Sequence, residues 1–335
     1  MSIYIIAEAG VNHNGSLGTA KKLIDAAAEA GCDAVKFQSF CAEKLVTKDA
    51  AKARYQTENT GTEESQYEML KKLELDYEEH KLLMNYCRSK NIEFLSTPFD
   101  TDASDMLDSM DVKRFKISSG DITNKPLLVH VAKKNKPIIL STGMATLEEI
   151  DEALQWIYSE GNTNVILLHC TSNYPTDYKD ANLTAMMTMK QHFKLEVGYS
   201  DHTIGIEIPI AAAALGAAVV EKHFTLDRTM VGPDHKASLE PKELSEMVKA
   251  IRNVESALGD GVKKPVSAEL DTKRVSRKSI VTTAEIYEDE IITLEKLTVK
   301  RPGTGIEPKY IDAIIGKRAK RALKADYLLS LDDLY

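Results

Sequence analysis

Short apolar runs alternate with longer amphipathic stretches over the first 260 residues of the chain. The apolar runs are rich in Val, Ile and Phe, which is typical of buried parallel strands. They lie at Ile3–Ala7, Asp33–Phe37, Ile92–Leu95, Arg114–Ile117, Pro137–Leu140, Val165–Leu168, Leu195–Tyr199 and Ala218–Glu221. Between them apolar residues recur every three or four positions, which predicts helices. Examples are Thr19–Ala30, Tyr77–Lys90, Leu127–Lys134, Leu147–Ser159 and Pro241–Ala257.

Eight strands that alternate with helices are the content of a closed parallel (β/α)8 barrel. An open doubly wound sheet also fits the alternation, but it predicts a G-x-G-x-x-G turn after the first strand, and the sequence has none. We therefore expect a TIM barrel over residues 1–260. A long polar insertion, Ser39–Asp76, separates the second strand from its helix. Loops of that length are usually functional or disordered.

The pattern changes after residue 260. Gly, Lys and Pro are frequent at residues 261–276 and indicate a linker. Short strands are expected at Ser279–Thr282, Ile291–Thr293 and Leu297–Lys300, and a small helix near Lys309–Ile315. We therefore predict a second, small α+β domain at residues 277–335.

Composition narrows the classes of function. The formal net charge of −8 over 335 residues argues against a nucleic-acid partner. The four cysteines lack the spacing of a metal site or a disulfide framework, which suits a reducing compartment. The first residues have no basic segment and too short an apolar run for a signal peptide, and no run reaches the roughly 20 apolar residues of a membrane span. We expect a soluble, cytoplasmic protein with no membrane partner.

Polar residues follow every one of the eight predicted strands, where barrel enzymes carry their catalytic groups. A single Ser or Thr at such a place is most often a helix cap or a turn residue, but that explanation is poor for eight strands together. Lys36 and Lys116 lie inside apolar runs, and a lysine is seldom buried without a partner. Two lysines with hydroxyls and backbone amides suit a small ligand that bears phosphate and carboxylate groups.

His202 and His223 follow the seventh and eighth strands, which are neighbours in a barrel. Neutral imidazoles on adjacent strands can share one divalent cation and leave positions open for a substrate oxygen. The alternatives are two structural histidines, or acid–base groups that need no metal. Two ligands make a weak site, which favours exchangeable Mn²⁺ or Mg²⁺ over structural Zn²⁺.

At these residues the chain resembles the bacterial sialic acid synthase family, which includes N-acetylneuraminate synthase and N,N′-diacetyllegionaminate synthase. The matching segments run in order along nearly the whole chain. They are Ile6-Ala-Glu-Ala-Gly-Val-Asn-His-Asn-Gly15, Val35-Lys-Phe-Gln38, Leu95-Ser-Thr-Pro-Phe99, Phe115-Lys-Ile-Ser-Ser-Gly120, Leu140-Ser-Thr-Gly-Met144, His169-Cys-Thr171, Gly198-Tyr-Ser-Asp-His-Thr203, Glu221-Lys-His-Phe-Thr225, Gly232-Pro-Asp-His-Lys-Ala-Ser238 and Lys300-Arg-Pro-Gly303.

The resemblance implies a transferase that condenses phosphoenolpyruvate with N-acetylmannosamine to give N-acetylneuraminate and phosphate. The alternative acceptor is 2,4-diacetamido-2,4,6-trideoxymannose, which gives N,N′-diacetyllegionaminate. The resemblance places phosphoenolpyruvate on Lys36, Thr97, Lys116, Ser119, Ser141 and Ser200, and Mn²⁺ on His202 and His223, with Mg²⁺ as the alternative metal. Tyr174 and Asp234 match positions that contact the sugar, and Glu8 and Asp121 are the carboxylates expected to guide water and protons.

The C-terminal module resembles the antifreeze-like (SAF) domain. In the family this domain caps the barrel of the other subunit in a domain-swapped homodimer, and Arg301 matches the arginine that reaches the N-acyl group of the sugar. Two departures concern the pocket: Ser172-Asn173 stands where some members have asparagine next to the threonine, and Asp121 stands where some have glutamate.

Two rival hypotheses make different predictions. A phosphoenolpyruvate-dependent synthase that acts on a sugar phosphate needs a further basic cluster for the second phosphate, and the strand ends offer no obvious one. A non-enzymatic ice or carbohydrate binder needs flat, threonine-rich faces, whereas the C-terminal segment is charged.

Overall fold

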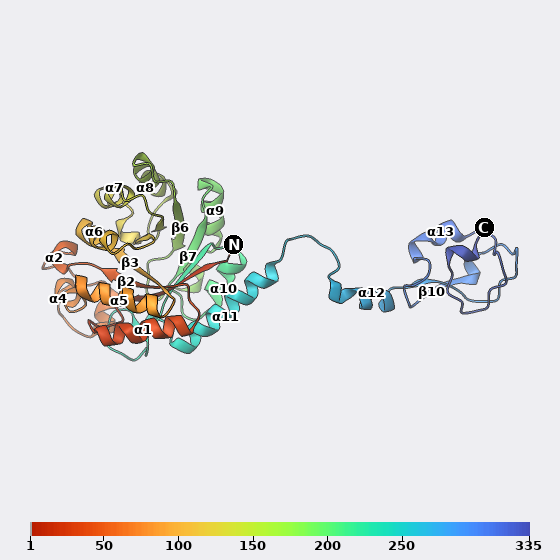
Figure 1. Cartoon of the computed structure of the whole chain (residues 1–335), viewed down its shortest axis with the longest axis horizontal. Helices are drawn as coiled ribbons and strands as arrows, with labels where there is room; N and C mark the ends of the chain where they lie inside the picture. Colours follow the sequence, from red (N-terminus) through yellow and green to blue (C-terminus); the bar gives the residue numbers. More distant parts are fainter. Residues whose placement is uncertain (1) are drawn as a thin grey trace. The chain divides into compact units, whose positions relative to one another are not determined.

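The computed structural model describes residues 2–335 and divides into two compact units, one ending at Gly259 and one spanning Asp260–Tyr335 (Figure 1). The first unit is built around one sheet of eight parallel strands. The strands are β1 (Tyr4–Gly10), β2 (Ala34–Ser39), β3 (Glu93–Pro98), β4 (Phe115–Ile117), β5 (Ile138–Ser141), β6 (Val165–Cys170), β7 (Val197–Asp201) and β8 (Val219–His223). Their order is β3-β2-β1-β8-β7-β6-β5-β4, and β3 also lies beside β4. The predicted TIM barrel is confirmed.

Helices surround the barrel (Figure 1). They are α1 (Leu17–Glu29), α5 (Tyr77–Ser89), α6 (Thr101–Ser109), α7 (Lys125–Ala132), α8 (Leu147–Ser159), α9 (Thr184–Phe193), α10 (Glu207–Ala214) and α11 (Pro241–Leu258). Helix α8 begins after a reciprocal capping box in which the Thr146 hydroxyl accepts from the Glu149 backbone and the Glu149 carboxylate accepts from the Thr146 backbone. Buried apolar residues on the inward helix faces pack against the outer faces of the strands in one continuous core.

Most strands extend further than the apolar pattern predicts. β2 continues to Ser39, β6 to Cys170 and β8 to His223, two residues beyond the predicted ends of all three. The ladder hydrogen bonds persist there although the inward side chains have become polar. The polar residues that sequence analysis places after the strands are therefore largely on the strands themselves.

The insertion between β2 and α5 is ordered and helical. It contains α2 (Ala42–Leu45), α3 (Arg54–Thr60) and α4 (Gln66–Lys71). A small apolar cluster separate from the barrel core joins the insertion to the loop after β1; its members include Val11, Phe40, Met69, Leu70 and Leu73. Tertiary packing of this cluster explains why a segment with a polar composition is folded.

The second unit has its own apolar core, built from side chains that include Ile280, Ile286, Ile292, Ile314 and Leu323. Its elements are α12 (Leu270–Ser276), an antiparallel pair β9 (Ser279–Thr282) and β10 (Leu297–Lys300), and α13 (Ile311–Ile314). The strand expected at Ile291–Thr293 does not form, because Ile291 makes only an isolated bridge to Arg318. The segment predicted as a linker contains α12, whose Arg274 carbonyl accepts from Gly303 N at 2.9 Å.

Short 3-10 turns complete both units. They lie at Ser119–Asp121, Tyr178–Asp180, His235–Ala237, Ser267–Glu269, Leu294–Lys296, Pro308–Tyr310 and Leu331–Asp333. Among residues 2–335, no helix combines the length and the apolar character that a membrane crossing requires.

Candidate active site

A cavity of about 530 Å³ opens at the carboxyl ends of the barrel strands. Of the predicted site residues in the first unit, all line this cavity except Asp121. The lining ones are Glu8, Lys36, Thr97, Lys116, Ser119, Ser141, Tyr174, Ser200, His202, His223 and Asp234. The structure thus brings together residues from every part of the barrel sequence, as a closed parallel sheet requires.

Lys36 is held on β2 by two acids and one hydroxyl. Its Nζ lies 2.8 Å from Glu8 Oε2 and 3.7 Å from Glu221 Oε2, and it donates to Thr97 Oγ1 at 3.0 Å. The Glu8 side chain is placed by a register shift in β1 between Glu8 and Gly10, where Gly10 has a φ of +52° that suits glycine. All these groups are almost fully buried, so the ammonium group depends on these partners instead of water.

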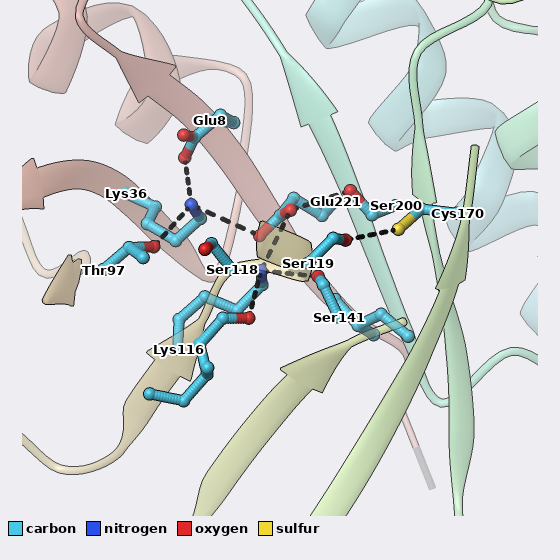
Figure 2. A network of polar contacts seen from close by, with 12 residues as sticks. Glu8, Lys36, Thr97, Lys116, Ser118, Ser119, Ser141, Cys170, Ser200 and Glu221 are labelled. Atoms are coloured by element: carbon cyan, nitrogen blue, oxygen red, sulfur yellow. Dashed lines mark hydrogen bonds and ion pairs between the residues drawn. The ribbon is translucent and has the colours of Figure 1, made fainter. Parts of the chain in front are cut away.

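Lys116 occupies the equivalent place on β4 and shares the same carboxylate. Its Nζ donates to Ser141 Oγ at 2.6 Å and lies 3.6 Å from Glu221 Oε1, which also accepts from Ser200 Oγ at 2.8 Å. Figure 2 shows the two ammonium groups approaching Glu221 from different sides. Glu221 therefore bridges the two lysines, and the cavity floor is nearly neutral without a ligand.

The pKa values of the two buried glutamates are shifted in opposite directions. Burial raises the pKa of Glu8 to about 7, although Lys36 opposes the shift. Burial also acts to raise the pKa of Glu221, but Lys116 and Lys36 together outweigh it and lower that pKa to about 2. Two neighbouring carboxyl groups whose pKa values are pushed apart are suited to different roles, one as a permanent anion and one as a proton carrier near neutral pH.

A backbone amide fixes one of the hydroxyl groups that line the cavity. Gly143 N donates to Ser119 Oγ at 2.9 Å, and Ser119 Oγ lies 3.2 Å from Cys170 Sγ. A Cβ on Gly143 would come within 2.3 Å of Ser172 Oγ, so only glycine fits here without rearrangement. The Gly143 amide is thus engaged by Ser119, and the Ser119 hydroxyl that it holds in place lines the cavity.

The rings of His202 and His223 lie side by side, with centroids 5.5 Å apart. His202 Nδ1 donates to the Thr171 carbonyl at 2.7 Å, which leaves a lone pair on Nε2. Burial lowers the pKa of both imidazoles and favours their neutral, metal-binding form. His223 Nδ1 is buried and has no hydrogen-bond partner in the described part of the chain. These two residues fit a shared divalent cation, although no group of three or more His, Cys, Asp or Glu ligands gathers within residues 2–335.

Tyr174 lies between the histidines and the insertion. Its ring centroid is 4.2 Å from that of His202, and Tyr55 of α3 stacks on it at 5.1 Å. Burial raises the pKa of the nearby Asp234 carboxyl to about 6. Asn59 of α3 donates to the carbonyl of Pro233, next to Asp234, at 2.6 Å. The insertion is therefore tied to the loop that carries Asp234.

One predicted residue of the first unit, Asp121, is absent from the cavity lining, and one, Arg301, belongs to the second unit. Asp121 follows β4, where its carboxylate accepts from Ser118 Oγ at 2.6 Å and from Asn124 Nδ2 at 3.0 Å. Burial raises its pKa. Arg301 is an exposed residue of the second unit, directly after β10. The catalytic role of Asp121 and the sugar contact of Arg301 stay predictions.

The structure adds cavity residues that sequence analysis did not assign to the site. Glu221 was visible as a carboxylate within an apolar strand run, and the burial of a charge in that position was an available indication. The insertion supplies seven more lining residues: Ala53, Tyr55, Gln56, Gln66, Met69, Leu70 and Leu73. No motif marked them, because their position depends on how the insertion folds.

Two protein-family models match the chain, and they divide it in nearly the same place as the two structural units. The model of the NeuB family matches residues 23–263, and the model of the SAF domain matches residues 277–334. The chain is 52% identical to N,N′-diacetyllegionaminic acid synthase of Campylobacter jejuni over 97% of this chain and 98% of that protein. It is 49% identical to the synthase of the same name from Legionella pneumophila, over 97% and 92% respectively.

A solved structure agrees with these similarities. The crystal structure of N-acetylneuraminic acid (sialic acid) synthetase from Leptospira borgpetersenii, in complex with citrate, superposes with a TM-score of 0.72. That protein is 39% identical, and the alignment covers 81% of this chain and 90% of that one.

Proposed function

This chain belongs to the NeuB family, and from that membership and the charges in its cavity we propose that it condenses phosphoenolpyruvate with an N-acylated amino-hexose. The observation that carries the proposal is the buried pair Lys36 and Lys116, bridged by Glu221 at the floor of the cavity. When Glu8 takes up a proton, the two cations share one anion, and the cavity floor then holds one spare positive charge for a ligand that bears both phosphate and carboxylate. The products are a nonulosonate of the sialic acid type and inorganic phosphate.

For the acceptor, the similarities favour 2,4-diacetamido-2,4,6-trideoxymannose over N-acetylmannosamine. Two relatives named N,N′-diacetyllegionaminic acid synthase are 52% and 49% identical to this chain, against 39% for the N-acetylneuraminic acid synthetase of known structure. A sugar phosphate is a poorer candidate, because Lys36 and Lys116 are the only lysine or arginine side chains among the residues that line the cavity of the described chain.

The reaction follows from the polarity of the two substrates. Carbon 3 of phosphoenolpyruvate bonds to carbon 1 of the open-chain sugar, water adds to carbon 2, and phosphate leaves with cleavage of its C–O bond. Lys36 and Lys116 hold the anion, with Thr97, Ser119, Ser141 and Ser200 as neutral donors around it. Holding two substrates near contact distance supplies much of the acceleration of a bimolecular step.

Glu8 is suited to proton transfer. Its pKa of about 7 leaves it divided between acid and base at neutral pH, which is where a general acid or base is most effective. Lys36 Nζ lies 2.8 Å from Glu8 Oε2 and stabilises the ionised form of Glu8. In this proposal Glu8 accepts a proton from the water that adds to carbon 2, and Asp121 orients its neighbour Ser118 at the cavity edge.

We further propose that His202 and His223 hold Mn²⁺, with Mg²⁺ as the alternative. When bound, such a cation supplies Lewis-acid polarisation of the aldehyde oxygen. Tyr174 shields one face of His202 from water through its close ring contact. The unpaired Nδ1 of His223 supports this proposal, because a buried nitrogen without a partner is costly unless it binds something.

The remaining proposals concern assembly and location. We propose that the protein is a homodimer in which Arg301 of one chain serves the cavity of the other, and that it works in the cytoplasm, where phosphoenolpyruvate is made. The support is the SAF-domain match, together with the absence of any arginine from the cavity lining within residues 2–335.

Phosphate release tests the proposed function directly. The protein is incubated with phosphoenolpyruvate and Mn²⁺, with each of the two N-acylated sugars in turn, with a phosphorylated N-acylated sugar, or with no sugar. We expect phosphate only when a sugar is present, and faster release with the 2,4-diacetamido sugar. Release without sugar contradicts condensation, and release only with a phosphorylated sugar supports the rival hypothesis.

A further inference from the structure

One side of the cavity is apolar. Val11, Met69, Leu70, Leu73 and Phe99 all line it, and we name these five residues the apolar wall. Three of them come from the region of α4, and Val11 and Phe99 follow β1 and β3. Val11, Met69, Leu70 and Leu73 are at most 9% exposed. The wall is therefore a packed surface and not a set of flexible side chains at the mouth.

The apolar wall lies over one half of the barrel. Its residues come from segments that follow β1, β2 and β3, beyond the Glu8, Lys36 and Thr97 side chains that these strands carry, whereas Lys116, Ser141 and Ser200 come from β4, β5 and β7. Tyr174 and His202 follow β6 and β7, across the barrel from β2. A substrate whose reacting carbon is near His202, after β7, can extend its far carbons across the cavity toward the wall.

The wall accepts a methyl group better than a hydroxyl group. Four of its five side chains have no hydrogen-bonding atom and the Met69 thioether is only a weak acceptor, so a sugar hydroxyl directed at the wall loses water without gaining a good partner. A methyl group at the same carbon is buried favourably. Side-chain amides stand beside the wall, where Gln66 Nε2 donates to Gln56 Oε1 at 3.4 Å and both residues line the cavity.

Resting on the proposed function, we propose that the apolar wall determines acceptor specificity by binding the 6-deoxy carbon of the sugar. Leu70 and Leu73 contact the methyl group, while the flanking glutamines face the acylamino substituents. The wall residues also pack against one another and against Phe40. A purely structural role for them predicts no preference at carbon 6.

The first experiment uses the unaltered protein and two acceptors. They are 2,4-diacetamido-2,4,6-trideoxymannose and its 6-hydroxy counterpart, which differ by one oxygen. We expect kcat/KM to favour the 6-deoxy sugar by about 10- to 100-fold. Equal values overturn this inference and leave the proposed function intact, whereas turnover of neither sugar overturns the proposed function itself.

The second experiment changes the wall. Leu70→Asn places an amide on it at similar volume, and Leu70→Met is the matched apolar control. We expect the asparagine variant to reduce the 6-deoxy preference about tenfold and the methionine variant to retain it, with KM for phosphoenolpyruvate unchanged in both. If Leu70→Asn fails to fold, Leu73→Asn replaces it. A preference unaltered in a folded asparagine variant overturns the assignment.

Discussion

The two sides of the cavity are built in different ways. The polar side places its charged groups on barrel strands, where Lys36, Lys116 and Glu221 are fixed by ladder hydrogen bonds and by one another. The apolar side comes mainly from an insertion whose helices have between four and seven residues. Chemistry that tolerates little displacement is thus supported by the most rigid part of the fold, and the surface that selects the sugar is supported by a part that can vary without disturbing the barrel.

The two sides of the cavity also contribute differently to the stability of the fold. A buried ion pair rarely stabilises a protein, because desolvation offsets the attraction. The network around Glu221 is therefore better understood as preorganised charge, kept inside the barrel for the moment when an anion arrives. The apolar side contributes ordinary burial, and its cluster is what folds the insertion.

Removal of the metal should produce the largest effect, because it acts where both substrates meet. We expect exhaustive chelation to lower phosphate release by more than about 100-fold, since Lewis-acid stabilisation is worth several kcal/mol, and Mn²⁺ to restore it. His223→Ala should abolish the restoration and should also weaken Mn²⁺ binding measured by calorimetry without substrates. The exposed His192 on α9 provides the control variant His192→Ala. Full activity after chelation contradicts the metal site.

Loss of one lysine should weaken the binding of phosphoenolpyruvate much more than the binding of the sugar. Lys116→Met removes a charge-assisted contact worth roughly 1.5–3 kcal/mol, so the apparent affinity for phosphoenolpyruvate should fall by about 10- to 150-fold. KM for the sugar should change far less, because the sugar is expected on the other side. Lys113→Met is the matched control, since the Lys113 side chain is 73% exposed just before β4. An unchanged affinity for phosphoenolpyruvate would reject the assignment of Lys116.

No arginine of residues 2–259 lines the cavity, and Arg301 is proposed to come from a second chain. Arg301→Ala should lower kcat/KM for the sugar by about 5- to 150-fold, the cost of leaving an acyl oxygen without its donor at 1–3 kcal/mol. Mixing Arg301→Ala with His202→Ala chains and allowing exchange should raise activity above either parent, because each mixed dimer regains one complete site. No recovery after demonstrated exchange places Arg301 in its own chain's site or outside any site.

More of the polar side of the cavity than of the apolar side could be predicted from the sequence. Lys36, Lys116 and His223 stand in or next to short apolar runs, and the barrel topology requires the ends of such runs to converge. The bridging role of Glu221 was not predicted, because it depends on which inward side chains of β2, β4 and β8 meet across the barrel.

The insertion was harder because its helices are short and its composition is polar. Met69, Leu70 and Leu73 have helical spacing, but three apolar residues in a long loop do not indicate which surface they face. Asp121 shows the opposite difficulty. Its position after β4 suggested a cavity carboxylate, whereas its oxygens are engaged by Ser118 and Asn124 in a local turn.

The pH dependence of anion binding should report on the polar side alone. Phosphoenolpyruvate beside Lys36 adds negative charge near Glu8 and should raise the pKa of Glu8 above about 7. Binding then takes up a proton, so affinity should fall as pH rises through 7 to 8, by at most about tenfold per unit. Calorimetry in two buffers of different ionisation enthalpy measures the uptake. Glu8→Gln should remove the part due to Glu8 and leave only that of the phosphate itself; an identical uptake in this variant contradicts the assignment.

The smallest effect should come from the link between the two sides. Asn59 on α3 of the insertion donates to the Pro233 carbonyl at 2.6 Å, which holds the insertion against the loop that carries Asp234. Asn59→Ala removes one neutral hydrogen bond worth about 0.5–1.5 kcal/mol, so KM for the sugar should rise about two- to tenfold. Steady-state kinetics with each substrate varied should leave KM for phosphoenolpyruvate unchanged, because its ligands are on strands. Asn253→Ala, at an exposed position of α11, controls for loss of an amide elsewhere. An equal rise for both substrates would mean that the insertion supports the whole cavity, and the division between a catalytic side and a selecting side would then be wrong.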